Sequence, residues 1–207
     1  MEQSVNNITL RGQLQTLPQF SHENHGRQFY RFYLEVQRLS GAVDTLPVIA
    51  EQPMIQHLDP FAGSMITVTG QIRSHNQRVN GVRHLMIFVF ASAISVDEGE
   101  PVNDVFLEGI LCKEPSFRRT PLGRDICDAM LAVPRAFRRA DYLPCILWGR
   151  TAQEISACDV GTRIRILGRL QSRIYTKLTD SGAEERTAYE ISALSAEAIE
   201  DEIQHQA

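Results

Sequence analysis

Residues 6–14 of the chain read NNITLRGQL, and 97 positions later residues 103–111 read NDVFLEGIL. Three further blocks recur in the same order at spacings of 97 or 98: LEVQR (34–38) as LAVPR (131–135), LPVI (46–49) as LPCI (143–146), and GSMITVTGQI (63–72) as GTRIRILGRL (161–170). Ordered blocks at a nearly constant spacing mark an internal repeat. The sequence therefore predicts two copies of one domain, at residues 1–98 and 102–200, joined near residues 96–102.

Within each copy apolar and polar residues alternate, and this period of two is typical of strands. The second copy predicts five strands, separated by turn signals at 120–123 and 180–182, near residues 103–112, 125–135, 142–148, 162–175 and 187–194. Residues 151–158 are helix-prone and lie between the third and fourth strands. Five strands with a helix in that place describe an OB-fold. We therefore expect an all-β protein made of two tandem five-stranded OB-fold barrels.

Charge is distributed unevenly along the 207 residues, whose formal net charge is -4. Lys113–Arg173 holds twelve basic and six acidic residues, whereas residues 1–100 hold seven arginines and nine acids. The basic stretch suits a phosphate backbone. No apolar run approaches the roughly 18 residues that span a membrane, and the first residues lack a secretory pattern. These features predict a cytoplasmic location without membrane contact.

The four cysteines lie at positions 112, 127, 145 and 158, and no two form a C-x-x-C pair. Structural zinc sites and disulfide frameworks use closer or paired cysteines, so we expect reduced thiols packed as small hydrophobic groups. The sequence contains no glycine-rich phosphate loop and no H-E-x-x-H motif. It therefore predicts a protein that is not an enzyme and needs neither a metal nor a cofactor.

Outside its core positions, the second copy contains aromatic residues interspersed with cationic ones. OB-folds that hold single strands stack bases on aromatic rings and track phosphates with cations. The candidate stacking residues are Phe137, Tyr142, Trp148 and Tyr175. The candidate phosphate contacts are Arg118, Arg119, Arg124, Arg135, Arg138, Arg139, Arg150, Arg173 and Lys177. Taken alone, a strand tryptophan is more often a core residue and an arginine-rich run is more often a solvated loop.

The second copy resembles the bacterial single-stranded DNA-binding protein family over nearly all of residues 103–195. The resemblance rests on RRTPLGR (118–124), LAVPRAFRRADYLPCILWGRTA (131–152) and GRLQSRIY (168–175). It implies that the four aromatic residues stack bases and that the protein binds single-stranded DNA with little sequence preference in replication, recombination or repair. It also implies a particle of four OB-folds, which for a two-copy chain is a homodimer.

The first copy departs from this pattern at the positions that matter for stacking. The repeat spacing places Ser40, Thr45, Glu51 and Gln77 where the second copy has its four aromatic residues. The first copy is therefore expected to keep the barrel without conventional DNA binding. Its own aromatic residues form either a substitute surface or, as we favour, core and barrel-to-barrel contacts: Phe29, Tyr30, Phe32, Tyr33, Phe88 and Phe90.

The closing residues 200–207 read EDEIQHQA and lack the acidic tip with Pro-Phe through which the family recruits replication proteins. Recruitment by that route is therefore not expected. One alternative remains a protein-interaction adaptor of replication restart or plasmid processing with residual nucleic-acid affinity. RNA also remains open as a ligand, because base stacking does not read the 2′-hydroxyl.

Overall fold

The computed structural model describes residues 5–56, 62–79, 81–179 and 182–199. The first half contains β1 (Asn6–Leu14), β2 (Gln19–Asn24), β3 (Arg27–Gln37), β4 (Val43–Glu51), α1 (Gln52–Gln56), β5 (Met65–Val79) and β6 (Val82–Val96). The second half contains β7 (Val102–Leu111), β8 (Ser116–Arg119), β9 (Asp125–Arg135), β10 (Arg139–Trp148), α2 (Gly149–Ser156), β11 (Arg163–Thr179) and β12 (Gly182–Ile199). A short 3-10 turn, Ala136–Arg138, joins β9 to β10.

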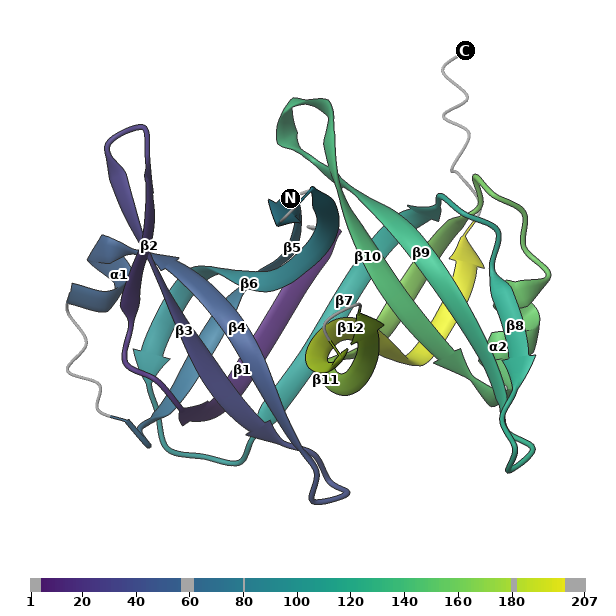
Figure 1. Ribbon diagram of the computed structural model, residues 1–207, viewed down its shortest axis with the longest axis horizontal. Coiled ribbons are helices and arrows are strands. Elements are labelled where there is room, and N and C mark those ends of the chain that lie inside the picture. The colour runs from purple at the N-terminus through teal and green to yellow at the C-terminus, as the bar shows by residue number, and fades with distance from the viewer. Residues whose placement is uncertain (1–4, 57–61, 80, 180–181, 200–207) are drawn as a thin grey trace, which may run out of the picture.

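Each half closes into a five-stranded barrel (Figure 1). In the first, the ring of hydrogen-bonded strands runs β1-β3-β4-β6-β5 and returns to β1, with β4 and β6 parallel. In the second, β7-β9-β10-β12-β11 closes in the same way, with β10 and β12 parallel. Along the chain, α1 connects β4 to β5 and α2 connects β10 to β11, so each helix follows the third barrel strand and precedes the fourth. This topology is that of the OB-fold, and the predicted fold class is confirmed.

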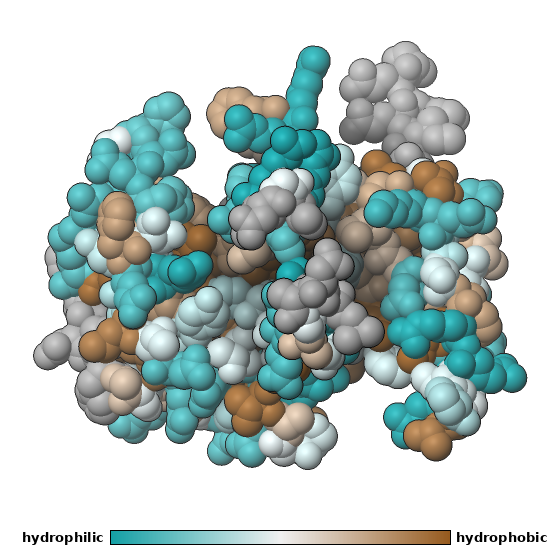
Figure 2. Space-filling view, viewed as in Figure 1, coloured by the Kyte–Doolittle hydropathy of each residue, from teal (hydrophilic) through white to brown (hydrophobic). Residues whose placement is uncertain are grey.

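The cores follow from the alternation in the sequence. Ile8, Leu10 and Leu14 point into the first barrel, and their repeat equivalents Val105, Leu107 and Leu111 are equally buried in the second. Barrel closure also depends on close backbone approach. A Cβ added at Gly70 or Gly168 would overlap a carbonyl oxygen of the neighbouring strand, where the strand register shifts. Figure 2 shows a largely hydrophilic face, with hydrophobic residues in small separate groups.

Several predicted strand boundaries were wrong. The last two strands of the second copy extend to Thr179 and from Gly182, well beyond the predicted 162–175 and 187–194. The short strand β8 was not predicted, and the signal at 120–123 is the turn between β8 and β9, where Gly123 has a φ of 77°. All four residues of β8 are exposed, so no buried face produces a period of two.

The thiols follow the expected pattern in part. Cys127 and Cys145 are buried, Cys112 and Cys158 are half-buried, and all four are free thiols. Burial raises the pKa of each thiol, most strongly at Cys145. Among the described residues, neither helix has the length and apolar character that a membrane crossing needs.

The two barrels are joined by antiparallel pairing of β1 with β7. Ile8 lies opposite its own repeat equivalent, Val105, and the register is symmetric about this pair. Beside it, the Asn6 side chain exchanges hydrogen bonds of 2.8 and 2.9 Å with the backbone of Ile72. Asn103 does the same with Leu170. The chain thus carries an internal pseudo-two-fold axis through the β1–β7 seam.

Two buried aspartates hold the long β5–β6 and β11–β12 hairpins across this axis. The carboxylate of Asp141 on β10 accepts hydrogen bonds from Arg73 at 2.9 Å and from the backbone N–H of Ser74 at 2.7 Å, both on β5. Its repeat equivalent, Asp44 on β4, accepts one from the backbone N–H of Ser172 on β11 at 2.7 Å. Each hairpin therefore rests on the opposite barrel.

Candidate nucleic-acid interface

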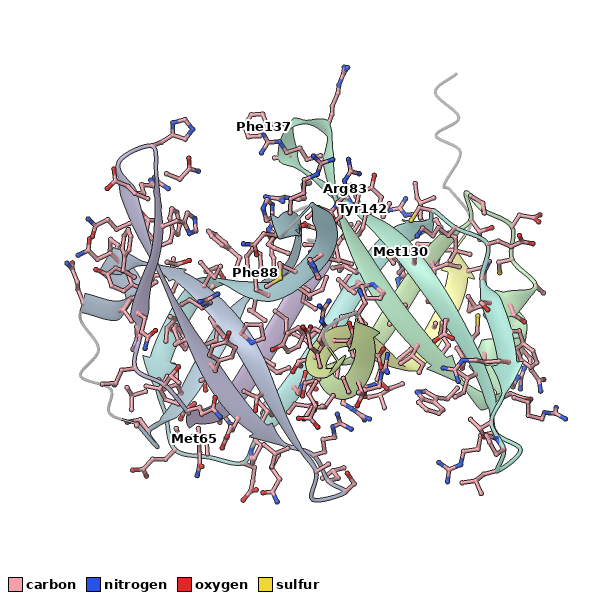
Figure 3. All side chains as sticks on the ribbon, viewed as in Figure 1. Met65, Arg83, Phe88, Met130, Phe137 and Tyr142 are labelled. Atoms are coloured by element: carbon pink, nitrogen blue, oxygen red, sulfur yellow. The ribbon has the colours of Figure 1, made fainter. Side chains whose placement is uncertain are left out.

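The tip of the β9–β10 hairpin presents Phe137 to solvent. The side chain is 93% exposed, and Figure 3 shows it standing beyond the barrel at the end of the hairpin. Because the phenyl ring is not buried there, it adds no hydrophobic stabilisation to the fold. Its exposure is therefore unexplained by the packing of the folded chain and is consistent with a platform for an external ligand.

The backbone at this tip is strained. Phe137 and Arg138 have φ values of 61° and 55°, in the left-handed region that bulky residues rarely adopt. In the first copy the equivalent of Arg138 is Gly41, with a φ of 84°, and glycine adopts this conformation without a steric penalty. The second copy thus places a cationic residue where the first copy has glycine, and a large aromatic residue beside it in the same left-handed region. Such strain often accompanies a functional site.

Strand β10 carries two more of the predicted aromatic residues. Tyr142 is 46% exposed and Trp148 is 39% exposed, and a separation of six residues places them on one face about 20 Å apart. The backbone N–H of Tyr142 donates to Ser74 Oγ at 2.7 Å, and the Trp148 indole N–H donates to Ser192 Oγ at 3.3 Å. These contacts fix the strand and the indole while part of each ring faces solvent.

The fourth aromatic residue, Tyr175, lies on the long β11–β12 hairpin rather than at a strand end. It is 37% exposed, and the guanidinium carbon of Arg173 lies 5.6 Å from its ring centroid. Arg173 also lies 3.8 Å from a carboxylate oxygen of Glu190. A base stacked on Tyr175 would therefore have a cationic group beside it.

The predicted cations divide into two groups. Five are held by carboxylates of the same copy: Arg118 by Asp128, Arg119 by Asp125, Arg135 by Asp141, Arg150 by Glu154 and Arg173 by Glu190. The other four, Arg124, Arg138, Arg139 and Lys177, have no carboxylate partner within the described part of the chain and are exposed. These four cations are the ones free to meet phosphates.

The first copy offers no equivalent surface at the corresponding positions. Thr45 is half-buried and donates its backbone N–H to Ser172 Oγ at 3.3 Å, while Glu51 lies 3.5 Å from Arg27. The core interpretation of the first copy's aromatic residues holds for Phe29 and Phe32, which are 7% and 1% exposed. Tyr30, Tyr33, Phe88 and Phe90 are half-buried.

Tyr189 lies on β12, facing the first copy. Burial raises the pKa of its phenol to about 12, the hydroxyl of Tyr33 adds to that shift, and Arg31 opposes it. The folded state thus holds the neutral phenol more tightly than the unfolded chain, whose tyrosines ionise near pH 10. That contribution to stability is complete below about pH 10 and is lost as the pH rises toward 12.

An alkaline titration followed by tyrosinate absorbance should therefore contain one phenol that ionises near pH 12. The variant Tyr189→Phe should lack that component, and its stability should depend less on pH between about 10 and 12. A variant that loses a component near pH 10 and keeps the one near pH 12 would contradict this assignment.

Sequence reasoning missed the residues that fix the two copies to each other. Arg73, Ser74 and Asp44 belong to this group, as do Ser172 and Asp141. A signal was present, because Asp44 and Asp141 are 97 positions apart and Ser74 and Ser172 are 98 apart, as the repeat requires. Polar residues that recur in both copies could have indicated a shared contact.

A closed OB-fold barrel with exposed aromatic rings beside unpaired cations defines a class of oligonucleotide-binding module. Comparison with known proteins narrows the class. The model of the single-strand binding protein family matches residues 102–199. Single-stranded DNA-binding protein B of Bacillus subtilis is 38% identical over 80 residues, which cover 35% of this chain and 71% of that protein. The chain belongs to this family.

The match differs in extent between relatives. The single-stranded DNA-binding protein of Bacillus cereus is 37% identical over 81 residues, and the chain spans 48% of its length. The crystal structure of the wild-type single-stranded DNA binding protein from Thermus aquaticus has a TM-score of 0.78 and 22% identity, covering 95% of this chain and 93% of that one. That likeness extends over both barrels and concerns the fold.

Proposed function

We propose that the chain binds single-stranded DNA with little sequence preference. Bases stack on Phe137, Tyr142, Trp148 and Tyr175, and phosphates pair with the free cations Arg124, Arg138, Arg139 and Lys177. One observation carries the proposal: the second copy exposes aromatic rings at four positions where the first copy has none. Since both copies close the same barrel, the fold alone does not require those rings.

The proposed activity is binding without a covalent step, so the protein is not an enzyme and needs no cofactor. Each aromatic platform accepts any base, because every base offers a π-face. The family resemblance and the names of the relatives support this function for the second copy. The cytoplasm is the proposed location.

The two copies have different roles in this proposal, the first at residues 1–98 and the second at residues 102–200. The first keeps the barrel and supports the assembly, and the second carries the conventional strand-binding surface. Two chains would assemble into a homodimer with four OB-folds. The closing acidic residues 200–207 lie outside the described residues.

Fluorescence of Trp148 tests the proposal directly, because it is the only tryptophan of the chain. Adding oligo-dT should quench its emission, because a base stacked directly on the indole quenches the excited ring. Binding should weaken with salt, and the slope of log K against log salt should be about -3 or steeper, since each of these four phosphate contacts contributes roughly 0.7. A matched oligo-rU in competition measures the preference for DNA over RNA.

Unchanged emission at low salt, together with no change in the anisotropy of a labelled oligo-dT, would overturn the proposal. If the oligo-dT binds without quenching, the strand follows a different surface from the one that carries Trp148. Equal competition by oligo-rU would replace the DNA assignment with general single-strand binding.

A further inference from the structure

A cleft of about 640 Å³ lies between the two copies. Figure 1 shows the β5–β6 and β11–β12 hairpins curling over the middle of the molecule, and Figure 3 places Arg83 in this central region. The first copy contributes Arg83, His84 and Met86 to the walls, and the second contributes Tyr175 and Lys177. The volume falls within the range of sites that enclose organic ligands, about 300–1,000 Å³.

The walls of the cleft combine apolar and cationic groups. Met86, on the first copy, is 38% exposed, and Tyr175 is exposed on the opposite side. No acidic residue is among the described residues that line the cleft. Arg186, which also lines it, pairs with Glu184 at 2.8 Å, whereas Arg83 and Lys177 have no carboxylate partner in the described part of the chain. A ligand with a flat apolar portion and a negative charge matches these walls.

We propose that the cleft is a composite subsite for one segment of single-stranded DNA, built by both copies. A base rests on Tyr175 and faces Met86, and its phosphates pair with Arg83 from the first copy and Lys177 from the second. The proposal rests on the proposed function and assigns the first copy a role in it. That copy holds the strand through cationic and apolar residues of its β5–β6 hairpin, without aromatic rings at the four platform positions.

The aspartate contacts between the copies explain why the subsite needs both of them. The Asp141 carboxylate holds β5 against β10 through Arg73 and Ser74, and Asp44 holds β11 against β4 through Ser172. Both walls of the cleft are therefore fixed by contacts between the copies. A nucleotide in the cleft meets groups that a single barrel could not bring together.

Arg83→Ala in the full chain tests the subsite, with Arg27→Ala as its matched control. Arg27 is another exposed arginine of the first copy, lies on β3 and does not line the cleft. Oligo-dT of about 30 nucleotides spans more than the roughly 4–16 nucleotides that one OB-fold holds. Arg83→Ala should weaken its binding roughly five-fold and make the salt slope about 0.7 shallower, the loss of one phosphate contact. Arg27→Ala should change neither quantity.

A double-mutant cycle with Lys177→Ala adds a second measurement. If Arg83 and Lys177 hold neighbouring phosphates of one segment, the double variant should lose less affinity than the two single losses combined. The inference is overturned if Arg83→Ala and Arg27→Ala bind like the parent chain, with equal salt slopes. Failure of the parent chain to bind oligo-dT overturns the proposed function instead, so the two failures are distinguishable.

Discussion

Replacing Phe137 by glycine is expected to weaken binding of oligo-dT by a factor of roughly 5 to 150 without destabilising the fold. Removal of one stacking ring costs about 1–3 kcal/mol of binding free energy, and this range gives the factor. The side chain is 93% exposed, so its loss uncovers almost no buried surface. Affinity is measured by Trp148 quenching and by anisotropy of a labelled strand.

The same Phe137→Gly variant is expected to be as stable as the parent chain or slightly more stable. Phe137 has a left-handed backbone, with a φ of 61°, and an L-residue pays about 1–2 kcal/mol for that conformation. Glycine removes the penalty but makes the unfolded chain more flexible, which costs about 0.5–1 kcal/mol. The free energy of unfolding should therefore stay constant or rise slightly. An increase in stability with a loss of affinity would mark Phe137 as a residue kept for its ligand.

Phe20→Ala is the matched control, because Phe20 is an exposed aromatic residue of the first copy, on β2. Its loss should leave affinity for oligo-dT unchanged. Equal weakening by the two variants would mean that aromatic side chains act nonspecifically. If the protein is instead the protein-interaction adaptor, replacing Phe137, Tyr142 and Tyr175 together by Ala should leave its function in cells intact.

Asp141→Ala is expected to lower the free energy of unfolding by about 3–5 kcal/mol, as loss of one partner of a buried ion pair does. The Asp141 side chain is fully buried and lies 2.9 Å from Arg73 and 3.3 Å from Arg135. It also accepts the backbone N–H of Ser74. Its removal leaves two guanidinium groups and an amide without their acceptor at the contact between the copies. Chemical denaturation followed by circular dichroism measures the change.

Asp128→Ala provides the comparison for this variant. Asp128 pairs with Arg118 at 2.7 Å, but both side chains are about half exposed. Exposed ion pairs contribute at most about 1 kcal/mol, because water and salt screen them. A loss at Asp128 as large as that at Asp141 would show that burial does not set the energy of these pairs.

The sequence predicted the barrels well because side chains along a barrel strand point alternately into the core and out to solvent, which produces an alternation of apolar and polar residues. Leu10 and Leu14 have buried equivalents in Leu107 and Leu111. The prediction failed where both faces of a strand meet water. Residues 176–177 and 182–185 are all exposed, so the hairpin ends of β11 and β12 carry no periodic signal.

The site was predictable in composition but not in geometry. The aromatic residues were identified by their absence from the first copy, a difference visible in the sequence. The pairing of Arg119 with Asp125 and of Arg150 with Glu154 was not visible, because it depends on side-chain conformation. The cleft was invisible too, since it arises from two hairpins that lie almost 100 residues apart along the chain.

The β1–β7 seam also bears on the direction in which a strand is held. A nucleic-acid strand is polar, with distinct 5′ and 3′ ends. Two identical barrels related by a true two-fold axis would offer it two equivalent tracks that run in opposite senses. In this chain Phe137 has Ser40 as its counterpart, so the two tracks differ. If the chain binds single-stranded DNA as proposed, the covalent pairing of unlike copies would let one chain hold the strand in a single polarity.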